Sequence, residues 1–82
     1  MKVLNEKIVD FFDKNKEEFI TNIIKGFEEG EDVVVLKIPF HHNKKRFKEG
    51  VINKIFNTFR GIDSAWDFKM EVNDEGIVVR FL

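Results

Sequence analysis

Apolar residues recur three and four positions apart in the middle of the chain, which is the spacing of one buried helix face. They are Phe47, Val51, Ile52, Ile55, Phe56 and Phe59. Asn43 stands before this run, where a helix cap belongs, and Gly61 follows its last turn. The pattern predicts a helix from about Lys44 to Arg60. Gly50 within it costs about 1 kcal/mol relative to Ala, which indicates either close packing there or a frayed helix.

Three shorter segments have the pattern of strands. Residues 33–38 form an apolar, β-branched run that Pro39 stops, because proline cannot donate to a sheet ladder. Residues 66–72 alternate between apolar and polar positions, the period of a strand with one covered face. Residues 73–76 supply turn residues, and residues 77–82 return as the partner strand. The last two segments therefore predict a C-terminal β-hairpin.

The first 30 residues allow two predictions, because a run of four polar residues interrupts their apolar face. Asn15 and Glu18 have the spacing of a capping box, so a helix is predicted to start near Lys16 and to end at Gly30. Residues 7–12 then form either a short strand or a short helix. The order of elements is βαβαββ with the strand and ααβαββ with the helix.

Both orders predict an α+β two-layer sandwich, with the helices on one face of a sheet of three or four strands. The 82 residues make one small globular domain, since chains divide into separate cores only well beyond this length. Ten Phe and one Trp supply the large side chains that a small core needs. The longest runs without charge have six residues, so we expect no membrane span.

The charges are distributed unevenly, although the net charge is only −1. Residues 33–48 contain five Lys or Arg, two His and no carboxylate. Lys44, Lys45 and Arg46 fall where the predicted middle helix begins, and cations there oppose the helix macrodipole. A local rule broken in this way is expected mostly at functional positions. The sequence therefore predicts a surface for an anionic partner, and the alternative is that these cations pair with carboxylates elsewhere in the fold.

Nucleic acid, either RNA or DNA, is the leading predicted partner of this surface, because cations and free backbone N–H groups at a helix start together hold a phosphate. The predicted contact residues are Lys37, His41, His42, Lys44, Lys45, Arg46 and Lys48. So few charges bind weakly, and a homodimer is implied if the affinity is to be useful. Phe40 could stack on an unpaired base, although a Phe after a buried strand more often belongs to the core.

Part of the chain resembles a known family. In residues 19–37, a helix of the pattern FITNII runs through a turn containing Gly30 into an apolar strand that ends in Lys. This stretch is similar to Alba-type chromatin and RNA-binding proteins, and the later helix and hairpin follow in the same order. The resemblance implies a βαβαββ fold and nucleic-acid binding, with Lys14 matching a lysine of the family's basic loop. Its neighbours Asp13 and Asn15 depart from the family's Lys and Pro.

The rival hypothesis is a small inhibitor or module that binds another protein, because the acidic cluster at residues 28–32 could steer onto a basic partner. No enzyme is predicted, since the single Ser64 lies far in sequence from both histidines. No metal or other cofactor is expected either, because two adjacent histidines on an extended segment point to opposite sides and no Cys is present. The lack of Cys also favours an intracellular, cytoplasmic location.

Overall fold

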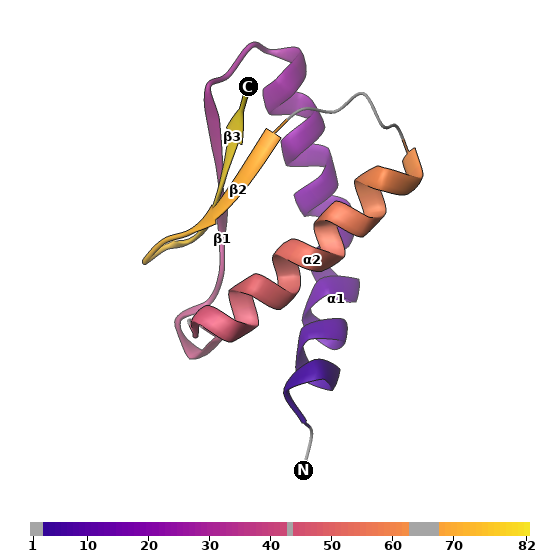
Figure 1. The fold of residues 1–82 in the computed structure, drawn as a ribbon, viewed down its shortest axis with the longest axis vertical. Helices are drawn as coiled ribbons and strands as arrows, with labels where there is room; N and C mark the ends of the chain where they lie inside the picture. Colours follow the sequence, from indigo (N-terminus) through magenta and orange to yellow (C-terminus); the bar gives the residue numbers. More distant parts are fainter. Residues whose placement is uncertain (1–2, 43, 63–67) are drawn as a thin grey trace.

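The computed structural model describes residues 3–42, 44–62 and 68–82. Its elements are α1 (Leu4–Glu28), β1 (Val33–Lys37), the short 3₁₀ helix η1 (Phe40–His42), α2 (Lys45–Ile62), β2 (Phe68–Val72) and β3 (Gly76–Phe81) (Figure 1). The described residues thus form a small α+β protein with two α-helices and a three-stranded antiparallel sheet. This confirms the predicted fold class, with α2 close to its predicted bounds. The predicted cap Asn43 and the first two residues of the predicted strand 66–72 lie outside the described residues.

The first helix is continuous, so neither predicted order of elements is correct. α1 runs without a break through the polar stretch that was expected to interrupt it. Asn15 does not cap a new helix, because its side-chain Nδ2 donates a hydrogen bond of 2.9 Å to the Phe11 carbonyl one turn earlier. It is half-buried and holds a place on the same helix face as Phe12 and Phe19. The packed face therefore continues through Asn15, and the observed order is αβαββ.

α1 ends at the glycine that the sequence predicts. Gly30 has φ +75°, a left-handed conformation that glycine adopts without steric cost. Its N–H donates to the Phe27 carbonyl at 3.2 Å, and the Glu31 N–H donates to the Gly26 carbonyl at 2.9 Å. These two bonds form a Schellman motif, which satisfies carbonyls at the helix end and turns the chain toward β1.

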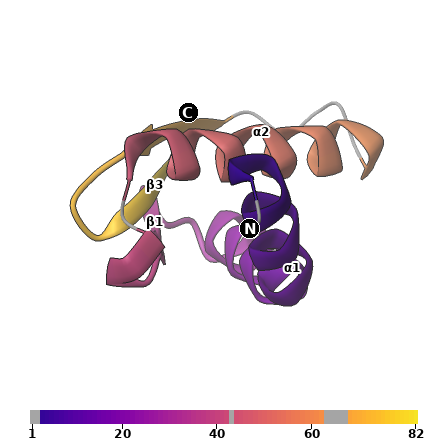
Figure 2. The same ribbon diagram turned by 90° about the horizontal axis from the view of Figure 1, so that it is seen from below.

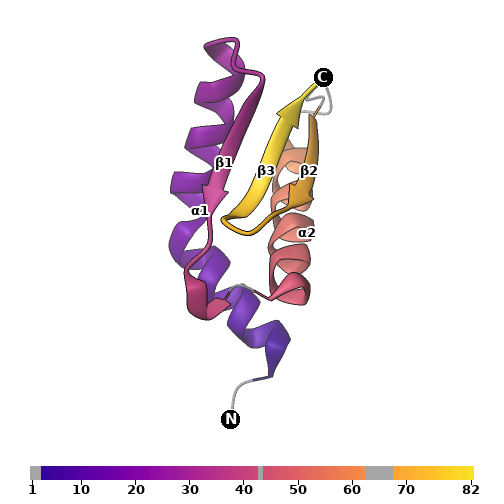
Figure 3. The ribbon, with the colours of Figure 1, turned by 90° about the vertical axis from the view of Figure 1, so that its left-hand side faces the viewer.

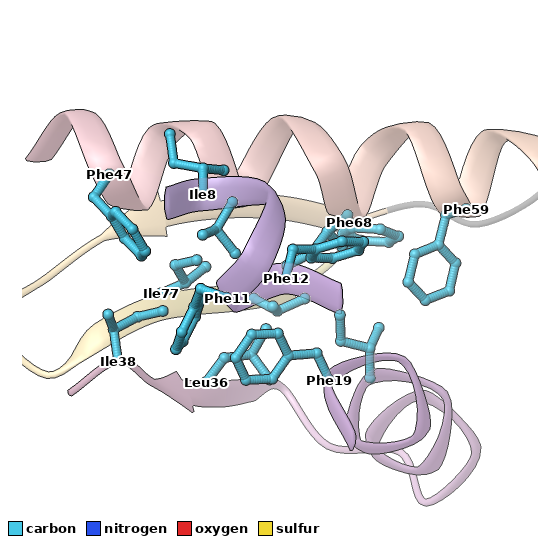
Figure 4. Packing of buried hydrophobic residues seen from close by; sticks show 14 residues of the cluster. Ile8, Phe11, Phe12, Phe19, Leu36, Ile38, Phe47, Phe59, Phe68 and Ile77 are labelled. Atoms are coloured by element: carbon cyan, nitrogen blue, oxygen red, sulfur yellow. The ribbon is translucent and has the colours of Figure 1, made fainter. Parts of the chain in front are cut away.

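The core lies between the two helices and one face of the sheet (Figure 4). Its residues are Ile8, Phe11, Phe12, Phe19, Ile23, Leu36, Ile38, Phe47, Val51, Ile55, Phe59, Phe68, Ile77 and Val79. The two helices cross steeply, since α1 is nearly end-on in a view that shows α2 lengthwise (Figure 2). A Cβ atom on Gly50 would lie 2.4 Å from Cδ1 of Ile8. The close packing predicted at Gly50 is therefore confirmed, and its partner is α1.

The predicted hairpin is confirmed and places β3 in the middle of the sheet. The strand order is β1-β3-β2, and both pairings are antiparallel. In the turn between β2 and β3, the Asn73 Oδ1 accepts hydrogen bonds from the N–H groups of Glu75 and Gly76, at 3.0 and 2.8 Å. A Cβ atom on Gly76 would lie 2.2 Å from the Leu36 carbonyl oxygen, so a glycine is needed where β3 begins beside β1.

Both helices cover the same face of the sheet, as predicted, and the other face is open (Figure 3). Leu36 of β1 points into the core with 1% exposure, whereas Val33 and Val35 on the opposite face are 38% and 39% exposed. Across this open face, Arg80 and Glu71 form a solvent-exposed ion pair of 3.9 Å. Within the described residues, neither helix is sufficiently long and apolar to cross a bilayer.

Candidate nucleic-acid interface

The chain between β1 and α2 carries most of the predicted contact residues, and a short turn fixes its path. Pro39 follows β1, and the His42 N–H donates to the Pro39 carbonyl at 2.9 Å, which closes the single turn of η1. The Ile38 N–H donates to the Glu75 carbonyl at 3.0 Å. This bond ties the end of β1 to the β2–β3 turn, so the junction rests on the sheet rather than on a free loop.

Three predicted contact residues stand exposed where α2 begins. The Lys44 carbonyl accepts a hydrogen bond of 3.1 Å from the Lys48 N–H, so Lys44 occupies the N-cap position. Lys45 and Arg46 follow in the first turn, which contains no acidic residue. None of these three side chains forms an ion pair or hydrogen bond with a described residue. The predicted conflict between cations and helix macrodipole is therefore present in the fold.

Lys48, one of the predicted contact residues, is buried, which the prediction of an exposed contact surface did not anticipate. It is only 5% exposed, and its Nζ donates a hydrogen bond to the Asn73 carbonyl at the start of the β2–β3 turn. The residue shares the inward side of α2 with Val51 and Ile55, which places its aliphatic stem beside the core. The Lys48 ammonium thus joins the first turn of α2 to the hairpin.

The side chains of the two histidines lie together, although they were expected to point to opposite sides. The expectation assumed an extended segment, whereas both residues belong to η1, and their ring centroids are 4.0 Å apart. The His42 ring stacks on Phe47, with centroids 4.4 Å apart and planes inclined by 2°. It meets Phe11 edge-on at 5.4 Å. Burial among these rings lowers the pKa of His42, and the nearby charges of His41 and Lys7 lower it further.

Lys14 joins the histidines through the continuity of α1. One hollow is lined by Lys7, Asp10, Phe11 and Lys14 of α1 and by Pro39, His41 and His42. Sequence reasoning missed Lys7 because it assigned residues 7–12 to a separate element. Lys7 and Lys14 are seven residues apart, a spacing that puts both on one side of an unbroken helix. That spacing would have identified Lys7 once the helix was taken as continuous.

Phe40 is 91% exposed and is not part of the core, although a Phe that follows a buried strand is more often buried. Strand alternation would place it on the same inward face as Leu36 and Ile38, but η1 begins at Phe40 and ends that alternation. Phe40 and Lys37 line a second shallow hollow, together with Asp74 and Glu75 of the β2–β3 turn. Lys37 therefore lies beside acidic residues, in a different hollow from Lys14 and the histidines.

Among the described residues, no three His, Cys, Asp or Glu side chains are arranged to hold a metal ion. Ser64, the single serine, lies outside the described residues. Comparison with known proteins finds no matching family, no matching curated protein and no matching solved structure. The resemblance to Alba-type proteins stays a prediction, and the geometry of the junction carries the functional interpretation.

Proposed function

We propose that this protein binds nucleic acid as a single strand, through the junction between β1 and α2. The observation that carries the proposal is the 91% exposed ring of Phe40, a few residues before three exposed cations at the start of α2. A phenyl ring in water contributes little to the described fold. It offers a flat apolar face on which an unpaired base stacks.

Phosphate contacts would come from Lys44, Lys45 and Arg46. An oxyanion beside the first turn of α2 would accept hydrogen bonds from N–H groups that have no partner within the helix, and would offset the three positive charges together. For a single strand, the slope of log affinity against log salt is about −0.7 per phosphate neutralised. These contacts use phosphates and base faces, which RNA and DNA share, so the proposal covers both and implies little sequence preference.

A single strand fits this surface better than a duplex does. Bases in a duplex are already stacked on one another, so Phe40 would have no free base face to contact. The backbone of a duplex would still meet the cations, which gives weaker binding that depends on salt. The exposed aromatic ring is therefore the feature that separates the two kinds of nucleic acid.

Fluorescence anisotropy of labelled single-stranded and duplex oligonucleotides, at two salt concentrations, tests this proposal. We expect single strands to bind more tightly, and Phe40→Ala to weaken their binding by about 1 to 3 kcal/mol, the contribution of one base–aromatic stack. Phe56→Ala is the control, because Phe56 is a 39% exposed phenylalanine that lies on α2, away from the junction. Failure of both oligonucleotides to bind at low salt would reject the proposal.

A homodimer would double the contact surface. With Lys48 buried, the segment from β1 to the start of α2 offers four exposed Lys or Arg side chains, which are Lys37, Lys44, Lys45 and Arg46. Four charges support only weak binding by one chain. The oligomeric state should therefore be measured by sedimentation with and without the oligonucleotide.

Protein binding is the second candidate, and a different observation favours it. Glu28, Glu29, Glu31 and Asp32 are all exposed around the turn between α1 and β1, where they could attract a basic partner. A pull-down with and without nuclease treatment separates the two candidates. If nucleic-acid binding is the function, nucleic acid is captured with the protein, and the nuclease removes it together with anything that it bridges.

A further inference from the structure

The hollow between α1 and η1 gathers positive and titratable groups from two separate parts of the chain. Lys7 and Lys14 reach it from α1, and His41 and His42 reach it from η1. Asp10 supplies the one carboxylate among the residues that line it. Pro39 forms part of its wall and also part of the neighbouring hollow that contains Phe40. The hollow therefore adjoins the proposed stacking surface but is made of different side chains.

His42 is repelled by two of its neighbours in this hollow. The charges of His41 and Lys7 both lower the pKa of His42, so these side chains are close enough to interact. The ionisable groups that face the hollow are Lys7, Asp10 and Lys14 of α1 and His41 and His42 of η1. The other contacts of the His42 ring, Phe11 and Phe47, are apolar and leave this repulsion in place.

The His42 side of the hollow is fixed in place by the packing of its ring against other rings. His42 packs against both Phe11 and Phe47, and its ring centroid lies 4.0 Å from that of His41. Each neutral imidazole has one N–H donor, each protonated imidazole has two, and each lysine ammonium has three. An oxyanion with several acceptor oxygens would satisfy these donors together and reduce the repulsion among them.

From this geometry we infer that the hollow lined by Lys7, Lys14, His41 and His42 binds a phosphate group. The oxyanion chemistry stands by itself, whereas the expectation that the phosphate belongs to a nucleic-acid strand rests on the proposed function. A strand whose base stacks on Phe40 would pass beside this hollow, since His41 is the next residue along η1. The hollow would then hold a phosphate that the start of α2 does not contact.

Nuclear magnetic resonance of the two histidines tests the inference with inorganic phosphate as the probe. The ring C–H signals of His41 and His42 are followed against pH, with and without phosphate. We expect phosphate to move both signals and to raise the pKa of His42, because a bound anion favours the imidazolium. Unchanged histidine signals at millimolar phosphate would overturn the inference.

Two pairs of substitutions assign the response to the hollow. Combining Lys7→Gln with Lys14→Gln should abolish the phosphate response, although without phosphate the pKa of His42 should rise because Lys7 no longer repels its proton. Combining Lys25→Gln with Lys69→Gln removes the same charge from exposed positions elsewhere, and the response should remain. A response that persists in the first pair would overturn the inference.

The source of the phosphate is determined with two further probes, a mononucleotide and a single-stranded oligonucleotide. Equal responses of the histidines to both would identify a site for free phosphorylated ligands. A response to the oligonucleotide at far lower concentration would place the hollow on the path of a strand. Either result supports a phosphate site. The proposed function would be rejected by a different result, which is oligonucleotide binding that depends neither on Phe40 nor on the cations of α2.

Discussion

The Lys48 ammonium donates a hydrogen bond to the Asn73 carbonyl and thereby connects the beginning of α2 to the β2–β3 turn. The two residues are 25 positions apart in the sequence. Lys48 is only 5% exposed and the bond is partly buried, a setting in which a charge-assisted hydrogen bond contributes more than it does in water. A residue of the basic segment thus bonds to a distant part of the fold.

Lys48→Met should destabilise the protein without affecting oligonucleotide binding. Methionine retains the apolar stem but leaves the Asn73 carbonyl without its donor, and losing a hydrogen bond to a charged group costs about 1.5 to 3 kcal/mol. Urea denaturation measures this loss. Lys69→Met, at an exposed site on β2, should stay within about 0.5 kcal/mol of wild type. Weaker oligonucleotide binding by Lys48→Met would mean that Lys48 is a contact residue after all.

Gly50→Ala should destabilise the packing of α2 against α1. The added Cβ would stand 2.4 Å from the Ile8 Cδ1, and overpacking of this kind costs about 1 to 3 kcal/mol. The better helix propensity of alanine stabilises the helix by about 1 kcal/mol, so the net loss of folding free energy is smaller. Ile8→Val removes that Cδ1, and in this background Gly50→Ala should cost less than in wild type. A double-mutant cycle by urea denaturation measures the coupling, and strict additivity would contradict the contact.

Stability should decrease in mild acid through His42. Its pKa in the folded protein lies below the ordinary value of 6.5, so the unfolded chain binds a proton more readily. Stability from this group is therefore present above the unfolded pKa and is lost as pH falls through it. Between about pH 7.5 and 5.5, the melting temperature of wild type should fall more than that of His42→Gln. Equal slopes for the two proteins would show that His42 titrates as it does in the unfolded chain.

Helices and strands with a strong apolar periodicity could be predicted from the sequence. The continuity of α1, which depends on one side-chain hydrogen bond, could not. The repeated apolar spacing of α2 and the alternation of the hairpin reflect one covered face, which local sequence records directly. Asn15 and Glu18 have the spacing of a capping box whether or not a helix begins there. The Asn15 bond to the Phe11 carbonyl is equally compatible with that sequence and leaves α1 unbroken.

The candidate site was predicted in part for a similar reason. Charge segregation identifies the start of α2, because a block of one sign is visible in any conformation. The burial of Lys48 depends on a carbonyl brought close by the fold, and the exposure of Phe40 depends on where η1 ends the alternation of β1. Lys7 enters the site only because α1 is continuous. Each of these outcomes is a tertiary consequence that local patterns do not record.

Reversing the sign of the cations at the start of α2 should leave the fold intact, because all three side chains are exposed. Replacing Lys44, Lys45 and Arg46 together by Glu puts carboxylates beside the positive end of the helix, where each contributes about 0.3 to 1 kcal/mol. The melting temperature should therefore stay the same or rise. The control makes the same change in net charge at other exposed positions, which are Lys16, Lys25 and Lys69.

The affinity of this triple variant for a single-stranded oligonucleotide at low salt is the most direct test of the account. We predict that Lys44→Glu, Lys45→Glu and Arg46→Glu together abolish binding measured by fluorescence anisotropy, without lowering the melting temperature of this variant. The control triple variant should lose much less affinity. Binding that survives the reversal at the start of α2, or that falls equally in both triple variants, would contradict the assignment of this surface to nucleic acid.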